Sequence, residues 1–165
     1  MRFTGTLYRA LNPVYAREPL SGRGAELFGG RFNPKGVAAL YTSLTVLTAL
    51  REANQVGTLQ PTTLVSYEAD IRVVFDCRQA DALAEFGMDE ATLGDAGWRN
   101  QMKTAGEAKT QAFARALIER GFHAMLVRSF ARATGAADLN LVIWSWNGAS
   151  ASRLSVIDDE GRLSR

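Results

Sequence analysis

The stretch from residue 29 to residue 52, GGRFNPKGVAALYTSLTVLTALRE, constrains the fold more than any other part of the chain. Arg31 directly follows two glycines, whose backbone can adopt conformations closed to other residues. An Asn-Pro-Lys-Gly sequence at residues 33–36 indicates a turn, and a short apolar run then leads to Tyr41. Glu52 lies in a helical pattern. The stretch therefore presents an arginine, a tyrosine and a glutamate from three different local structures.

The helix that carries Glu52 can be capped by Ser43 or Thr45. Leucines mark its apolar side, whereas Glu52 shares a face with Thr45, Thr48 and Ala49. A small polar face of this kind suits a bound ligand. A solvated flank has the same pattern, and helix geometry alone favours the solvated flank.

The rest of the chain predicts an α+β fold with a mixed or antiparallel sheet, in one domain over residues 1–165. We expect six or seven strands and two or three substantial helices. The glycine-rich segment 16–30 is expected to be a long loop with little regular structure. Strands are predicted over residues 5–11, 38–42, 62–75 (one long or two short), 122–129, 139–146 and 153–157, short helical pieces over 80–85 and 89–93, and the clearest helix over 107–120.

Composition excludes several classes of function. With 47% hydrophobic residues, the 165-residue chain can bury a real core. The single cysteine, Cys77, excludes a disulfide framework and a cysteine-based zinc site within one chain, and the single histidine, His123, argues against a His-rich metal site or a conventional Ser-His-Asp triad. A net charge of +2 does not imply nucleic acid binding. No apolar run is long enough to span a membrane, and the first residues lack the apolar core of a signal peptide, so we expect a cytoplasmic protein.

Five side chains are candidates for ligand binding, and each has a plainer alternative. Arg31 could approach a pyrophosphate with two parallel hydrogen bonds, or lie on the surface near a turn. Arg9 is similar but lies on a predicted strand. Tyr41 could stack on a planar ring and hydrogen-bond through its hydroxyl, or simply be a core tyrosine. Glu52 could support positive charge at an anomeric carbon. Ser129 could contact the same ligand or only end a strand.

The combination of short motifs is more specific than any one residue, and it resembles the RES domain, a family named for its Arg, Glu and Ser. The family often has Trp where this chain has Phe32, and Pro where it has Arg128. The resemblance covers residues 7–157. It is carried by Tyr8-Arg9, Gly22-x-Gly-Ala25, Gly29-Gly-Arg-Phe-Asn-x-x-Gly36, Leu40-Tyr-Thr-Ser43, Thr48-Ala-Leu-x-Glu52, Arg128-Ser129 and the strand that starts at Asn140.

The resemblance implies a toxin of a bacterial toxin–antitoxin pair, whose partner is an Xre-type helix-turn-helix antitoxin. It also implies a fold like that of diphtheria-type ADP-ribosyltransferase toxins, with NAD as substrate and no metal. Family members either degrade NAD, with water or phosphate as acceptor, or transfer ADP-ribose to a protein, in one branch a nucleotide-biosynthetic enzyme.

Carried over residue by residue, the resemblance implies that Arg31 binds the NAD phosphates with help from Arg9. Tyr41 would stack on the nicotinamide side, Glu52 would orient the nicotinamide ribose and support charge at its anomeric carbon, and Ser129 would complete the pocket. We therefore predict cleavage of the nicotinamide–ribose bond with transfer of ADP-ribose, with a protein as the favoured acceptor. The alternatives are an NAD-degrading toxin and an inactive module that only binds the antitoxin; direct nucleic acid binding is a weaker third.

Overall fold

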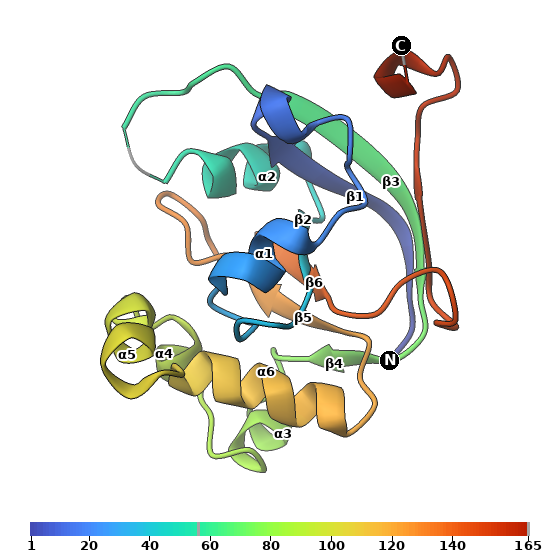
Figure 1. Cartoon of the computed structure of the whole chain (residues 1–165). Helices are drawn as coiled ribbons and strands as arrows, with labels where there is room; N and C mark the ends of the chain where they lie inside the picture. The colour runs from blue at the N-terminus through green and yellow to red at the C-terminus, as the bar shows by residue number, and fades with distance from the viewer. Residues whose placement is uncertain (56, 165) are drawn as a thin grey trace.

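A computed structural model of the chain describes residues 1–55 and 57–164. It has an α+β architecture, as predicted, with seven strands in one mixed sheet (Figure 1). The elements in chain order are β1 (Phe3–Leu11), η1 (Pro13–Tyr15), α1 (Arg23–Phe28), β2 (Leu40–Ser43), α2 (Val46–Ala53), β3 (Thr63–Ile71), β4 (Val74–Asp76), α3 (Ala80–Ala84), α4 (Glu90–Leu93), α5 (Trp98–Ala105), α6 (Lys109–Glu119), β5 (Ala124–Arg128), β6 (Leu139–Ile143), β7 (Arg153–Val156) and η2 (Arg162–Ser164).

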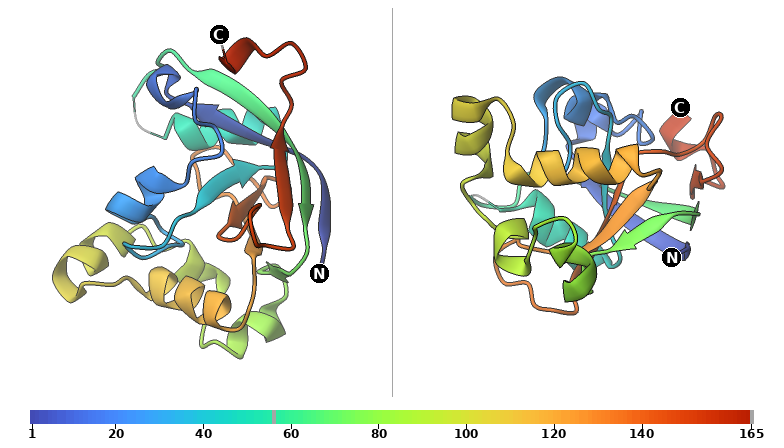
Figure 2. Two further views of the ribbon diagram at one scale, coloured as in Figure 1. Left: turned by 45° about the vertical axis from the view of Figure 1, so that its right-hand side comes forward. Right: turned by 90° about the horizontal axis from the view of Figure 1, so that it is seen from below.

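The strand order is β4-β5-β6-β2-β1-β3-β7, and every pair is antiparallel except β4 with β5. The long strands β1 and β3 pair along their whole length and curve around one side of the molecule (Figure 2). In contrast, β1 and β2 pair at one position only, Tyr8 with Ser43. The sheet therefore opens between β1 and β2 beyond this pair, in front of α2.

Two apolar clusters explain why β5 and β6 are almost continuously apolar in sequence. Alternate side chains of a strand point to opposite faces, and both faces of this pair are covered. Met125 and Val127 join Phe113 and Leu117 of α6 in one cluster, whereas Leu126 joins the β1–β3 side in the other. Each fully buried side chain of this size contributes about 1.5–3 kcal/mol, so these clusters fix the middle of the sheet, where Asn140 lies on β6.

The three longest helices match the two or three substantial helices predicted, and the short helical pieces expected over 80–85 and 89–93 are α3 and α4. Six α-helices occur in the described part of the chain, of which only α2, α5 and α6 have eight residues or more. The expected loop 16–30 contains α1. Contacts from outside the helix help to fix it, because the carbonyl of Ala25 accepts the Asn33 amide at 2.8 Å and the carbonyl of Glu26 accepts the Gly36 N–H at 2.8 Å. No helix within residues 1–55 and 57–164 is long and apolar enough to cross a membrane.

Candidate active site

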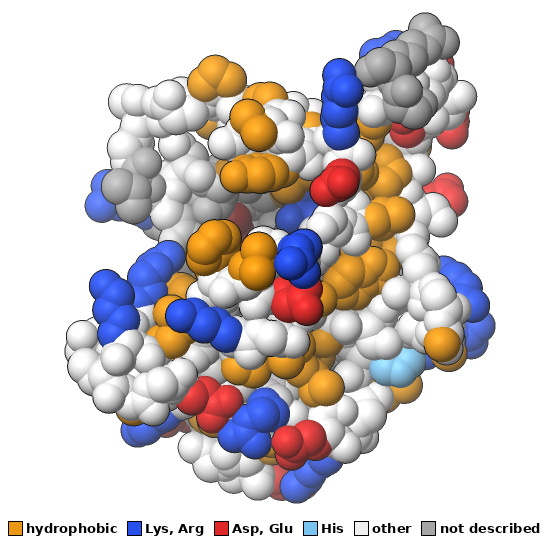
Figure 3. All heavy atoms as spheres, viewed as in Figure 1, with side chains coloured by type: hydrophobic (Ala, Val, Ile, Leu, Met, Phe, Trp, Pro, Cys, Tyr) orange, Lys and Arg blue, Asp and Glu red, His pale blue; other side chains and the backbone are white. Residues whose placement is uncertain are grey.

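Two adjoining cavities, of about 290 and 300 Å³, lie where the sheet opens. Figure 3 shows the surface hollowed between the part of the molecule that holds α2 and the part that holds α1 and α5. Four residues line both cavities: Tyr41, Glu52, Gln55 and Asn140. The first cavity adds Gly29, Gly30, Arg31, Phe32, Trp98, Arg99, Val127, Arg128, Phe130 and Val142, and the second adds Tyr8, Arg9, Ala10, Leu11, Thr42, Ser43, Ala49 and Ala53.

Glu52 is half-buried at the junction of the two cavities and is held by three side chains. Its Oε1 accepts hydrogen bonds from the Ser129 hydroxyl and, at 2.6 Å, from the Asn140 amide. Its Oε2 accepts from the Gln55 amide at 2.7 Å. The solvated-flank alternative is therefore wrong. Thr45 caps α2 through a hydrogen bond from the Thr48 N–H at 3.1 Å and so fixes the start of the helix that presents this carboxylate.

Ser129 is fully buried directly after β5, and its hydroxyl donates to Glu52. The same oxygen accepts the Ala131 N–H at 3.2 Å. Ser129 therefore lies behind the carboxylate. Asn140 lies beside it, with an amide whose orientation is set by Ser43, because the Ser43 hydroxyl donates to Asn140 Oδ1 at 2.7 Å. The amide N–H is thereby directed at Glu52, which needs donors to stay a stable partly buried anion.

Arg31 lines the first cavity and is fixed by main-chain oxygens. Its Nη1 donates to the carbonyls of Leu93 at 3.0 Å and Asp95 at 3.1 Å, and its guanidinium lies over the Phe130 ring at 5.5 Å from the centroid. Burial lowers the pKa of Arg31, but an arginine stays charged at neutral pH. Its other guanidinium nitrogens have no hydrogen-bond partner among the described residues, which leaves donors for an anionic ligand.

Tyr41 presents its ring, and not its hydroxyl, to the cavities. The hydroxyl donates to the buried Asn33 Oδ1 at 2.7 Å and accepts the Phe32 N–H at 3.0 Å. Burial raises the pKa of Tyr41, while 36% of the residue stays exposed. Gly30 is required here, because a Cβ at that position would lie 2.3 Å from the tyrosine hydroxyl. Ring stacking on a ligand agrees with this geometry, but the predicted hydrogen bond from the hydroxyl to a ligand does not.

Arg9 lines the second cavity and not the first. Its Nη1 donates to the Pro19 carbonyl at 3.0 Å, an oxygen that also accepts the Tyr67 hydroxyl at 2.8 Å. The two predicted phosphate ligands, Arg9 and Arg31, thus lie in different cavities. The carboxylate of Glu52 lies where these cavities meet, so one long ligand with anionic groups could contact all three residues.

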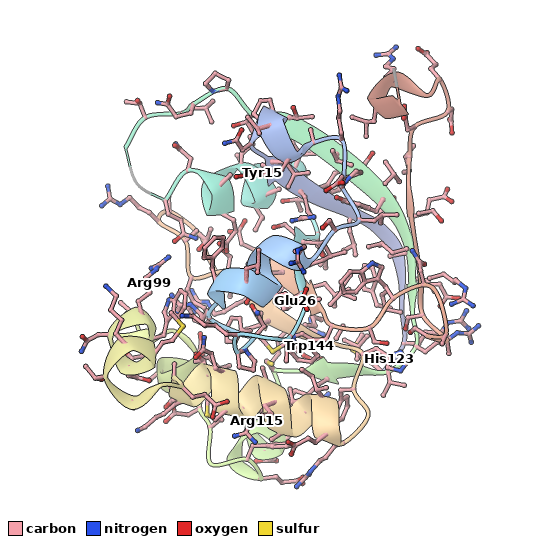
Figure 4. All side chains as sticks on the ribbon, viewed as in Figure 1. Tyr15, Glu26, Arg99, Arg115, His123 and Trp144 are labelled. Atoms are coloured by element: carbon pink, nitrogen blue, oxygen red, sulfur yellow. The ribbon has the colours of Figure 1, made fainter. Side chains whose placement is uncertain are left out.

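Sequence reasoning missed several residues of the site. Asn140 had a detectable signal, since an amide inside the apolar run LNLVI is costly unless it is hydrogen-bonded. Trp98 and Arg99 of α5, whose ring centroid and guanidinium carbon lie 4.5 Å apart, had no such signal. Figure 4 shows Arg99 extending from α5 on the side that faces α2.

Two polar residues that could have been catalytic lie outside the cavities. His123 is hydrogen-bonded through Nδ1 to the Ser152 hydroxyl at 2.7 Å, and Cys77 is buried, which raises the pKa of its thiol. Within the described ranges, no group of three or more His, Cys, Asp or Glu side chains is placed to hold a metal ion. The charged side chains that line the two cavities are Glu52, Arg9, Arg31, Arg99 and Arg128.

The fold and the cleft define a small α+β protein with a hydrogen-bonded carboxylate between two arginine-lined cavities. The chain belongs to the RES domain family, whose model matches residues 6–165. A chain in the crystal structure of the M. tuberculosis MbcT–MbcA toxin–antitoxin complex has the same fold, with a TM-score of 0.69, 20% identity, and coverage of 96% of this chain and 84% of that chain. No curated protein matches the sequence significantly.

Proposed function

We propose that this protein is a cytoplasmic toxin that cleaves the nicotinamide–ribose bond of NAD and transfers ADP-ribose to an acceptor protein. The observation that carries the proposal is the Glu52 carboxylate, held by Ser129 and Asn140 at the junction of two cavities. Membership of the RES family supports NAD as the substrate. The likeness to a chain of a toxin–antitoxin complex supports a toxin whose partner is an antitoxin, which we expect to be of the Xre helix-turn-helix type.

The reaction breaks the bond between the ribose anomeric carbon and the pyridinium nitrogen, and both electrons stay on nitrogen. Nicotinamide leaves as a neutral molecule, so no strong general acid is needed. The ribose becomes an oxocarbenium ion, which the fixed carboxylate of Glu52 stabilises. A nucleophilic atom of the acceptor then bonds to the anomeric carbon and loses its proton to water or to Glu52. Since Glu52 is already oriented, little reorganisation is needed during bond cleavage.

The remaining candidates bind NAD or support Glu52. Arg31 has free donors for a phosphate oxygen, with Arg9 assisting from the second cavity. The exposed ring of Tyr41 stacks on the nicotinamide side. Ser129 acts on the substrate through Glu52 because it is fully buried.

The proposal is tested with NAD labelled in its adenylate half, incubated with the protein in buffer and in a cell lysate. We expect label on a discrete protein band, with a nucleotide-biosynthetic enzyme as the first target to look for, and loss of that band in Glu52→Gln. Glu68→Gln is the matched control, since Glu68 is exposed on β3. Label released only as small products would replace transfer by NAD degradation, with water or phosphate as acceptor. Intact NAD in both conditions would overturn the proposal and favour an inactive antitoxin-binding module.

A further inference from the structure

Asp138 ends the loop between β5 and β6 and joins this loop to α2. Its carboxylate Oδ1 accepts the Thr48 hydroxyl at 2.7 Å, and its Oδ2 accepts the Gly135 N–H at 2.8 Å. Its main-chain carbonyl accepts the Ser129 N–H at 2.7 Å. One residue therefore connects the helix that carries Glu52 to the serine that donates to Glu52.

Thr48 is fully buried and lies four residues before Glu52, which places both side chains on the same face of α2. Its hydroxyl donates its only proton to Asp138. In the 2.8 Å contact between the Thr45 and Thr48 hydroxyls, Thr45 must therefore be the donor. A chain of hydrogen bonds thus runs from the N-cap residue Thr45 through Thr48 to the Asp138 carboxylate. This carboxylate lies at the N-terminal end of α2, where a negative charge is favourable.

Neighbouring groups stabilise the negative charge of the Asp138 carboxylate. The Thr48 hydroxyl, the Gly135 N–H and the Arg51 guanidinium at 3.4 Å lower the pKa of Asp138, so the carboxylate is ionised at neutral pH. The loop formed by residues 129–138 also contacts α2 at two points that lie one helical turn apart. The first is Asp138 with Thr48, and the second is Ser129 with Glu52.

We propose that Asp138 is a positioning residue that sets the place of the Glu52 carboxylate by fixing α2 to the loop after β5. If the contact between Asp138 and Thr48 is removed, α2 can move along the loop, and the hydrogen bonds of Ser129 and Asn140 to Glu52 lengthen. Because Glu52 stabilises the transition state, such a shift lowers kcat while substrate binding is retained. The expected fall in kcat rests on the proposed function, whereas the expected displacement of the Glu52 carboxylate does not.

Two substitutions of Thr48 separate the effect of its hydroxyl from the effect of its shape. Thr48→Val removes the donor and keeps the shape, whereas Thr48→Ser keeps the donor. We expect kcat for NAD cleavage to fall about 10- to 100-fold in Thr48→Val and Asp138→Ala, with KM within about twofold, and to recover in Thr48→Ser to within about threefold of wild type. Arg51→Met is the control, because the Arg51–Asp138 contact is long, and we expect it to change kcat by less than about threefold.

A second readout does not depend on activity. With glutamate labelled by ¹³C at the side-chain carboxyl, the NMR signal of Glu52 is assigned by its loss in Glu52→Gln. We expect this signal to move in Thr48→Val and Asp138→Ala and to stay in place in Thr48→Ser. Wild-type kcat together with a wild-type signal in Thr48→Val would overturn the inference, as would failure of Thr48→Ser to recover. A shifted signal in Thr48→Val with no NAD consumption by wild type would support the positioning and overturn the proposed function.

Discussion

Two charged groups of the cleft, Glu52 and Arg31, are held in opposite ways. Glu52 depends on side chains, because Ser129, directly after β5, and Asn140, on β6, both donate to its Oε1. Arg31 depends on the backbone, because its Nη1 donates to main-chain carbonyls at and just after the end of α4. The position of the Glu52 carboxylate thus depends on which side chains surround it, whereas the position of the Arg31 guanidinium depends on the conformation of the neighbouring backbone.

This difference determines how each side responds to substitution. A side-chain donor is removed by a single mutation, whereas a carbonyl acceptor survives every side-chain change that preserves the backbone. The carboxylate side should therefore be sensitive at several positions, and the guanidinium side chiefly at Arg31 itself. The following variants test that contrast, from the largest expected effect to the smallest.

Ser129→Ala and Asn140→Ala should each lower kcat for NAD cleavage by up to about 100-fold with little change in KM. Each removes one of the two donors to Glu52 Oε1, and a small displacement of a catalytic group has this scale of effect. Steady-state kinetics of NAD consumption measure it, with Ser155→Ala on the exposed edge strand β7 as control. Wild-type kcat in both variants would mean that Glu52 does not need this support.

Arg31→Ala should weaken NAD binding about 10- to 100-fold, because charge-assisted hydrogen bonds are lost. Arg31→Lys should be intermediate, since it keeps the charge but not the planar fork of donors. Isothermal titration of NAD in the Glu52→Gln background avoids turnover. Arg162→Ala, an exposed arginine of η2, is the control. Normal affinity in Arg31→Ala would remove Arg31 from the phosphate site.

Tyr41→Phe should destabilise the fold by about 1–3 kcal/mol and change kcat by less than about threefold. The hydroxyl is engaged by Asn33 and the Phe32 N–H, and its loss leaves these buried groups unpaired, whereas the ring that faces the cavities is kept. Urea denaturation gives the stability and NAD consumption gives the rate. Loss of activity with unchanged stability would assign the hydroxyl a chemical role.

Asp95→Asn should change NAD affinity by less than about twofold, which is the smallest effect expected. Asp95 holds Arg31 through its main-chain carbonyl, and an asparagine keeps that carbonyl and can still accept the Gly97 N–H. Titration of NAD under the conditions used for Arg31→Ala measures it. A loss as large as that of Arg31→Ala would show that the Asp95 carboxylate itself positions the guanidinium, and the contrast between the two sides would fail.

The parts of the site that were predictable from sequence are those with local signals. The capped helix α2, the strand β2 that carries Tyr41, and the buried strands β5 and β6 can each be predicted from residues that are close together in the sequence. The hydrogen bonds that hold Glu52 were not predictable: Ser129 was a candidate for the same pocket and the Asn140 amide had a signal, but neither pattern shows that both side chains donate to one carboxylate 77 and 88 residues earlier in the chain. The role of the Tyr41 hydroxyl was missed for a different reason: its acceptor Asn33 is only eight residues away, but in sequence it looks like an ordinary turn residue.

Release of nicotinamide from NAD by the purified protein, free of any partner, tests the central claim most directly. Wild type, Glu52→Gln and the exposed control Glu68→Gln are compared at equal concentration, with folding checked by circular dichroism. The account predicts release by wild type and Glu68→Gln, and a rate at least about 100-fold lower in folded Glu52→Gln. Release by Glu52→Gln at the wild-type rate, or no release by wild type, would contradict it.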